Sequence, residues 1–150
     1  MKIVIFKKKK INLGEQPVTE WTLLEYKKWF SIKLFHFHKT SGSQDRFHTH
    51  AFNAFSFLIK GDYTEEVIDK GVIVKLSRSR ERLLFIPRDN YHRITKSEGC
   101  WTLLFTGPWG DEFKELRGEV TQGHTTWCEW VCGPQRKDLR KLDNIKLNGD

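Results

Sequence analysis

Short apolar segments follow one another along this chain with turn residues between them, and this pattern constrains the fold more than any other feature. Runs of this kind occupy about residues 29–38, 51–60, 63–68, 72–76, 82–87, 91–95, 101–106 and 127–131. Short runs bounded by Gly, Pro, Asp and Asn are typical of β-strands. About eight strands in succession, without helices between them, predict an all-β sandwich or jelly-roll barrel.

One segment is predicted as a helix. Residues 19–29 begin with Thr19, which can cap a helix, and carry charged residues at positions expected to be exposed. We therefore expect a short N-terminal helical segment. The 150 residues suit a single domain, because this length allows a sizeable core and contains no evident linker.

Composition excludes several classes of protein. Hydrophobic residues make up 38% of the chain, which is too many for a disordered protein, and no apolar run approaches the roughly 20 residues that cross a bilayer. At the N-terminus the charged residues follow the apolar ones, the reverse of a secretory signal. Three cysteines provide no even disulfide framework, so a reduced, cytoplasmic protein is expected.

The formal net charge is +7, which favours anionic partners. Much of the excess lies in the lysine run at residues 7–10 and in the C-terminal tail, and we interpret both as solvated charge. A small anionic ligand remains open. A nucleic-acid partner is not indicated, because no helix-turn-helix, RNP-like or zinc-finger motif accompanies the charge.

Three histidines are candidate metal ligands. His48 and His50 would project from the same face of a strand, at a separation that lets two imidazoles reach one ion at about 2.0–2.2 Å. His92 opens a later strand after the polar turn of the segment PRDNYH. An H-x-H pair also occurs as two partly exposed histidines at a strand end, so the pair alone does not define a site.

These two segments resemble the motifs of the cupin superfamily. The first cupin motif contains H-x-H followed by a glutamate and a glycine, and the glycine is matched by Gly61. The second contains Pro-x-Gly and then a histidine, and here Asp89 replaces the glycine. The glutamate would fall at Ala54 or Phe55, neither of which binds metal. The resemblance therefore implies a site of three histidines, with positions left for water, dioxygen or substrate.

The chain resembles more closely a group of small single-domain cupins of bacteria and phages, largely without assigned function. The shared segments are WFSIKL from residue 29, HTHAFNAFS from 48, GDYTEE from 61, IPRDNYHRI from 86, WTLLFTGP from 101 and WCEWV from 127. The resemblance implies a cupin-type double-stranded β-helix, a jelly-roll barrel, with its core at about residues 29–131. Residues 132–150 are expected to form a charged, loosely packed tail.

Other residues near these motifs are weaker candidates. His36 and His38 could supply a further nitrogen or lie at a strand edge, and Glu65 and Glu66 are expected to be solvated. The residues considered for substrate binding are Asn53, Arg88, Tyr91, Arg93 and His36, although the two arginines are equally consistent with surface charge. The aromatic residues expected to fill the barrel are Phe52, Phe55, Phe57, Phe85, Phe105 and Trp101.

The leading functional hypothesis is a metal-binding cupin that holds one divalent transition metal through His48, His50 and His92. Fe(II) is favoured and Zn, Ni, Mn or Cu remain open, so an oxygenase acting on a small molecule is the corresponding activity. One alternative is a non-catalytic module that binds a small ligand. Another is a metal-free cupin like the sugar-nucleotide epimerases, with a histidine base and a tyrosine acid. A homodimer is expected from family habit, with residues 2–6 as a candidate pairing strand.

Overall fold

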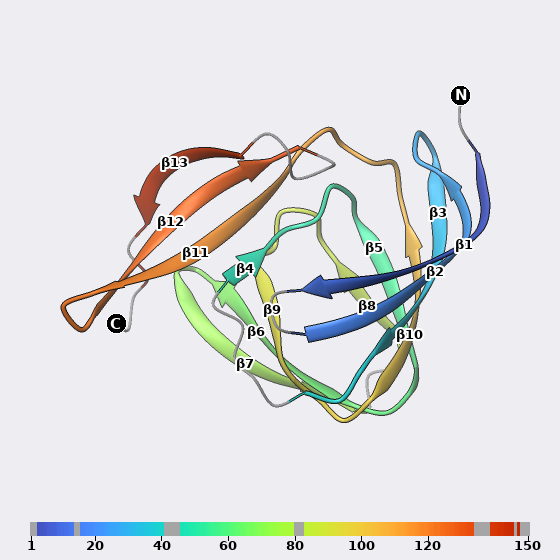
Figure 1. The fold of residues 1–150 in the computed structure, drawn as a ribbon, viewed down its shortest axis with the longest axis horizontal. Coiled ribbons are helices and arrows are strands. Elements are labelled where there is room, and N and C mark those ends of the chain that lie inside the picture. Colours follow the sequence, from blue (N-terminus) through green and yellow to red (C-terminus); the bar gives the residue numbers. More distant parts are fainter. Residues whose placement is uncertain are drawn as a thin grey trace.

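The computed structural model describes residues 3–13, 16–40, 46–79, 83–133, 139–145 and 147. These residues form two antiparallel sheets that face each other as a barrel (Figure 1). The first sheet has the order β1 (Val4–Leu13), β2 (Gln16–Tyr26), β3 (Phe30–Phe37), β10 (Cys100–Thr106), β5 (Ala54–Lys60) and β8 (Leu83–Ile86). The second has the order β13 (Leu139–Ile145), β12 (His124–Cys132), β11 (Phe113–Thr121), β4 (Arg46–His48), β9 (His92–Ser97), β6 (Tyr63–Asp69) and β7 (Val72–Arg78). The all-β prediction is confirmed.

The predicted N-terminal helix is wrong, because no helix occurs in the described ranges and residues 16–26 form β2. This strand pairs with β1 on one side and with β3 on the other, and Val18, Glu20 and Thr22 are buried. Backbone pairing on both sides and burial outweigh a weak local helix preference. Trp29 lies beyond β2 in a turn, where its amide donates to the Tyr26 carbonyl at 2.8 Å.

Strands β11 and β13 were not predicted, and β1 was predicted only at its start, where residues 2–6 were a candidate pairing strand. β1 contains the run Lys7–Lys10, whose residues pair with Thr22, Trp21, Glu20 and Thr19 of β2. β13 pairs with β12 and lies in the segment expected to be a loose tail. These strands carry charged residues in place of the apolar alternation on which strand prediction depends. The predicted loop at residues 40–45 lies almost wholly outside the described residues.

The buried apolar residues among the described segments form three clusters. One cluster contains Phe47, Leu116, Trp127 and Leu147, on the outer side of β4 and β11. A second contains Ala51, Phe52, Ala54 and Leu104, and a third contains Leu58, Tyr63, Ile94 and Cys100. The second and third clusters lie between the sheets and leave space for a cavity.

Gly61 stands at the close turn between β5 and β6. Its φ is +82°, and a Cβ at this position would lie 2.8 Å from the Gly99 carbonyl oxygen and 2.9 Å from Cys100 Cα. Both the backbone angle and the close approach require glycine. This is a structural reason for the glycine that the sequence shares with cupins.

The outer face of the first sheet is apolar and exposed. Ala54, Ser56 and Leu58 of β5 point inward, and the residues between them therefore point outward. The outward residues are Phe55, Phe57 and Ile59 of β5, Leu83 and Phe85 of β8 and Phe105 of β10, and each is 37–63% exposed. We call these six residues the outer aromatic face. The prediction that Phe55, Phe57, Phe85 and Phe105 fill the barrel was wrong, whereas Phe52 is buried inside it.

None of the described segments is a helix that is long and apolar enough to cross a membrane.

Candidate metal centre

The three candidate histidines are brought together by two neighbouring strands of the second sheet. His48 ends β4 and pairs directly with His92 at the start of β9. The chain then leaves β4, and the backbone amide of Thr49 donates to the Lys114 carbonyl at 2.8 Å while the Lys114 amide donates to Thr49 Oγ1. The His50 amide donates to the Arg88 carbonyl at 3.0 Å, which ties it to the turn before β9.

The side chains of these histidines converge. The ring centroids are separated by 5.1 Å for His48 and His50, 4.7 Å for His48 and His92, and 4.9 Å for His50 and His92. One potential ligand nitrogen from each residue lies within 4.8 Å of the other two. This is the single group of three or more potential ligands found among the described residues, and it contains no carboxylate.

Two of the nitrogens have the environment of metal ligands. His50 Nδ1 and His92 Nε2 are buried, and neither has a hydrogen-bond partner within the described part of the chain. Burial and the neighbouring His92 lower the pKa of His50 to about 3, so this imidazole is neutral at physiological pH. Neutral imidazole is the form that binds transition metals. The donor set therefore fits a divalent transition metal.

Glu65 fixes the orientation of His92. Its Oε2 lies 2.9 Å from His92 Nδ1, and its Oε1 accepts a hydrogen bond from Arg78 Nε at 2.6 Å. Burial alone would raise the pKa of the Glu65 carboxyl, but His92 and Arg78 outweigh this and hold the pKa below its usual value. A carboxylate at Nδ1 leaves Nε2 as the ligand nitrogen. The expectation that Glu65 is solvated was wrong, since only 2% of it is exposed.

The place of the missing glutamate is apolar. Ala54 is buried in the core and Phe55 lies on the outer aromatic face. His36 and His38 do not replace it: His36 stacks on Trp101 at 4.3 Å between ring centroids, and His38 Nε2 lies 2.9 Å from Thr19 Oγ1. Neither belongs to the histidine group, so three candidate ligands are gathered in the described part of the chain.

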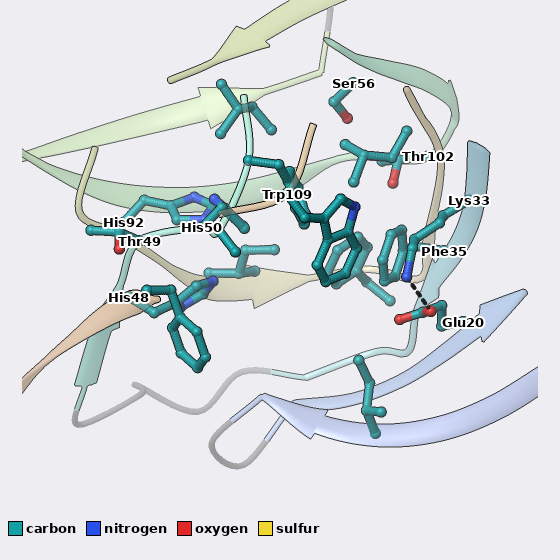
Figure 2. Close-up of a pocket in the computed structure, with 18 of the residues that line it drawn as sticks. Glu20, Lys33, Phe35, His48, Thr49, His50, Ser56, His92, Thr102 and Trp109 are labelled. Atoms are coloured by element: carbon teal, nitrogen blue, oxygen red, sulfur yellow. Dashed lines mark hydrogen bonds and ion pairs between the residues drawn. The ribbon is translucent and has the colours of Figure 1, made fainter. Parts of the chain in front are cut away.

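A cavity of about 240 Å³ opens beside the histidines, between the two sheets. Its walls are largely apolar, with Phe35, Phe52 and Leu104 among them. Figure 2 shows His48, His50 and His92 on one side of this space and Lys33 with Glu20 on the other, with Trp109 and Phe35 between them. The cavity thus combines a cluster of nitrogen ligands, apolar walls and a charged pair.

The residues proposed for substrate binding lie outside this cavity. Asn53 is exposed, and its Oδ1 accepts a hydrogen bond from the Arg88 amide at 2.8 Å, while the Arg88 side chain is half exposed near Gly110. Tyr91 donates to Glu129 on the outer side of the second sheet.

Two further candidates also face outward. Arg93 pairs with Glu66 at 2.8 Å and lies over the Phe47 ring. His36 points away from the cavity, because its strand neighbours Phe35 and Phe37 are the residues that line it. The structure brings none of the five to the histidines.

The sequence reasoning missed Lys33, Glu20 and Trp109 as cavity residues. Lys33 stands within the run WFSIKLFHF, which is apolar at alternate positions on both faces, so periodicity did not distinguish the inner face from the outer. Glu20 was placed on the surface of a helix. Trp109 follows a Gly-Pro turn and offered no signal apart from its size.

Comparison with solved structures identifies related folds. EutQ from Clostridium difficile shares 19% identity at a TM-score of 0.50, over 66% of this chain and 75% of EutQ. Oxalate decarboxylase from Bacillus subtilis shares 16% at a TM-score of 0.51, over 71% of this chain and 29% of the decarboxylase. The structure titled FeII HppE shares 15% at a TM-score of 0.53, over 69% of this chain and 59% of that protein. At these identities the similarity defines the fold alone.

No family model matches the sequence, and no curated protein matches it.

Proposed function

We propose that this chain, which has the cupin fold, is a metal-binding cupin that acts on a small molecule held in the barrel. His48, His50 and His92 would hold one divalent transition metal, with Fe(II) as the favoured ion. The observation that carries the proposal is the convergence of three imidazoles, two of which have a buried nitrogen without a hydrogen-bond partner in the described ranges. The solved structure of FeII HppE has a similar fold, and the iron in its description supports the choice of ion.

The bound ion would supply redox and Lewis-acid chemistry, and oxygen-dependent oxidation is the reaction that three neutral histidines and Fe(II) suit best. The chain supplies the setting. Glu65 holds His92 with Nε2 toward the ion, and the backbone bonds of Thr49 and His50 fix the two histidines of the H-x-H motif. The apolar walls exclude water and accommodate the apolar part of a small molecule.

The test is the metal content of protein purified without chelators. We expect one transition metal per chain, and loss of that metal in the double variant His48→Ala, His92→Ala. His124→Ala is the matched control, because His124 is exposed on β12 and distant in sequence from both motifs. Metal at well below one ion per chain that does not change in the double variant would overturn the proposal.

Oxygen consumption distinguishes an enzyme from a binding module. Fe(II)-loaded protein is supplied in turn with small thiols, sugars and nucleotides, and the rate is compared with that of the double variant. Ligand-dependent thermal stabilisation without oxygen uptake would favour the non-catalytic alternative. The metal-free alternative requires a histidine base, and the low pKa of His50 makes that residue a weak one.

The outer aromatic face supports a homodimer. Phe105, Phe55 and Phe85 stand side by side across β10, β5 and β8, and the Phe55 and Phe85 rings lie 5.1 Å apart. A fully buried aromatic side chain contributes roughly 200 Å², so the four half-exposed phenylalanines of this face offer roughly 400 Å² per subunit, to which Ile59 and Leu83 add. Standard interfaces bury about 800 Å² per partner. The face has no charged member, so a second copy of this chain is a suitable partner.

Light scattering after size-exclusion chromatography tests this pairing. We expect a dimer for the natural chain and a folded monomer for Phe55→Glu, Phe85→Glu. Val120→Glu, an exposed apolar position on β11, is the control and should remain dimeric. A monomeric natural chain, or a dimer that persists in the double variant, would refute the assignment.

Three buried cysteine thiols support a reducing compartment such as the cytoplasm.

A further inference from the structure

The hairpin formed by β1 and β2 brings charged side chains to the end of the cavity opposite the histidines. A second cavity of about 170 Å³ lies there, and its charged residues are Lys7, Lys9, Lys27, Lys33, Glu20 and Glu25. The two cavities share Lys9, Glu20, Lys33 and Trp109 as walls. The second cavity is therefore adjacent to the first, at the end of the barrel away from the histidines.

The carboxylates of this cluster already have partners. Lys33 Nζ lies 2.8 Å from Glu20 and 3.3 Å from Glu25, and Lys9 Nζ lies 3.3 Å from the other oxygen of Glu20. Lys33 and Glu20 are buried, with 3% and 4% exposed. Burial alone would raise the pKa of Glu20, but Lys33 and Lys9 hold it below its usual value, so the carboxylate is charged.

Positive charge remains in excess. Four lysines and two glutamates line the second cavity, which leaves two positive charges unbalanced. Lys7 and Lys27 form no ion pair with any carboxylate in the described part of the chain, and Lys27 Nζ lies 4.6 Å from the centre of the Trp109 ring. Lysine ammonium groups gathered around a concave site attract anions more strongly than single lysines on an open surface.

We propose that the ligand of this barrel is a small amphipathic acid, whose carboxylate or phosphate is bound by Lys7 and Lys27 at the second cavity. Its apolar body lies against Phe35, Phe52 and Trp109, and its other end faces the histidines. Lys33 and Lys9 balance the charges of Glu20 and Glu25 at the floor of the site, so the excess positive charge is that of Lys7 and Lys27. The orientation toward the histidines rests on the proposed function, whereas the binding of the anionic group does not.

Binding to metal-free protein tests the inference separately from the metal site. Protein treated with chelator is titrated by calorimetry with hexanoate and with hexan-1-ol, which have the same carbon chain and differ in charge, and with inorganic phosphate. We expect hexanoate to bind at least about tenfold more tightly than hexan-1-ol, the factor for one charge-assisted hydrogen bond. Added salt should reduce this preference.

The double variant Lys7→Met, Lys27→Met should bind the two probes equally. Both lysines are exposed, so the substitutions should leave the fold intact, as circular dichroism will verify. The control is Lys28→Met, which removes an adjacent exposed charge that does not line either cavity and should preserve the preference. The inference is overturned if hexanoate binds no better than hexan-1-ol, if neither hexanoate nor phosphate binds at millimolar concentration, or if both variants behave alike. Metal content is independent of these outcomes.

Discussion

Replacing Glu65 by glutamine should weaken metal binding without touching a metal ligand. The carboxylate now receives two hydrogen-bond donors, with His92 Nδ1 at 2.9 Å and Arg78 Nε at 2.6 Å. The glutamine amide has one acceptor oxygen and one donor nitrogen, so either His92 or Arg78 would face a donor. The negative charge that raises the basicity of the His92 ring would also be lost.

The magnitude follows from these contacts. Loss of a carboxylate behind a ligating histidine typically costs 10- to 100-fold in metal affinity, which corresponds to about 1.4–2.7 kcal/mol. The same substitution breaks a buried ion pair with Arg78 and should lower the free energy of unfolding of the metal-free protein by about 3 kcal/mol. The two effects are measured separately, because unfolding is followed in the presence of chelator.

The assay is competition between the protein and a chromophoric chelator for Zn(II), with folding checked by circular dichroism at the same temperature. Glu66→Gln is the matched control, because Glu66 is the next residue of β6 but pairs with Arg93 on the opposite face. It should lose some stability and retain its metal affinity. Equal affinity in Glu65→Gln and the natural chain, or an equal loss in Glu66→Gln, would refute the role assigned to Glu65.

Three further outcomes are expected. The pKa of Glu20 is lower in the folded chain than its usual value of 4.5, so its contribution to stability is complete above that pH and is lost as the pH falls through the folded pKa. In urea unfolding at neutral pH, Glu20→Gln should lower the free energy of unfolding by about 3 kcal/mol, because Lys33 loses one of its partners. Below pH 4.5 the stability of this variant should depend less on pH than that of the natural chain. Gly61→Ala should lower the free energy of unfolding by about 3 kcal/mol in the same measurement, because the added Cβ would lie 2.8 Å from the Gly99 carbonyl oxygen and φ at this position is positive. A decrease of less than about 1 kcal/mol would contradict this expectation. His36→Ala should retain full metal content by elemental analysis, since its side chain stacks outside the barrel, and a loss of metal would contradict its placement.

The apolar strands and the histidine cluster could be predicted because each is indicated by a short contiguous segment of the sequence. Short apolar runs bounded by turn residues mark β5, β6 and β10, and two short motifs brought His48, His50 and His92 together before any tertiary information. The lysine run of β1 and the mixed polar and apolar sequence of β2 could not be predicted in this way, because these segments owe their strand conformation to pairing with each other and with β3. Local propensity there is weak, and the wrong helix followed from it.

The orientation of a strand is harder to predict than its existence. β3 carries apolar residues on both faces, and the choice of inner face decides whether His36 or Lys33 belongs to the cavity. The structure selects Lys33, because Glu20 on the neighbouring strand provides its counter-charge. For Glu65 a signal was present: it is two residues after the buried Tyr63 on the same strand, so alternation directs it inward and Glu66 outward.

The hairpin of β1 and β2 joins the first sheet only at the edge of β3, yet it supplies Lys7, Lys9 and Glu20 to the charged end of the barrel. By contrast, His48 ends β4 and His92 begins β9 in the other sheet, and His50 follows two residues after β4. The proposed anion-binding residues and the proposed metal ligands thus come from separate stretches of the sequence. If both proposals hold, substitutions in β1 and β2 would alter ligand preference without altering the three histidines, and exchange of this hairpin between related barrels would transfer that preference.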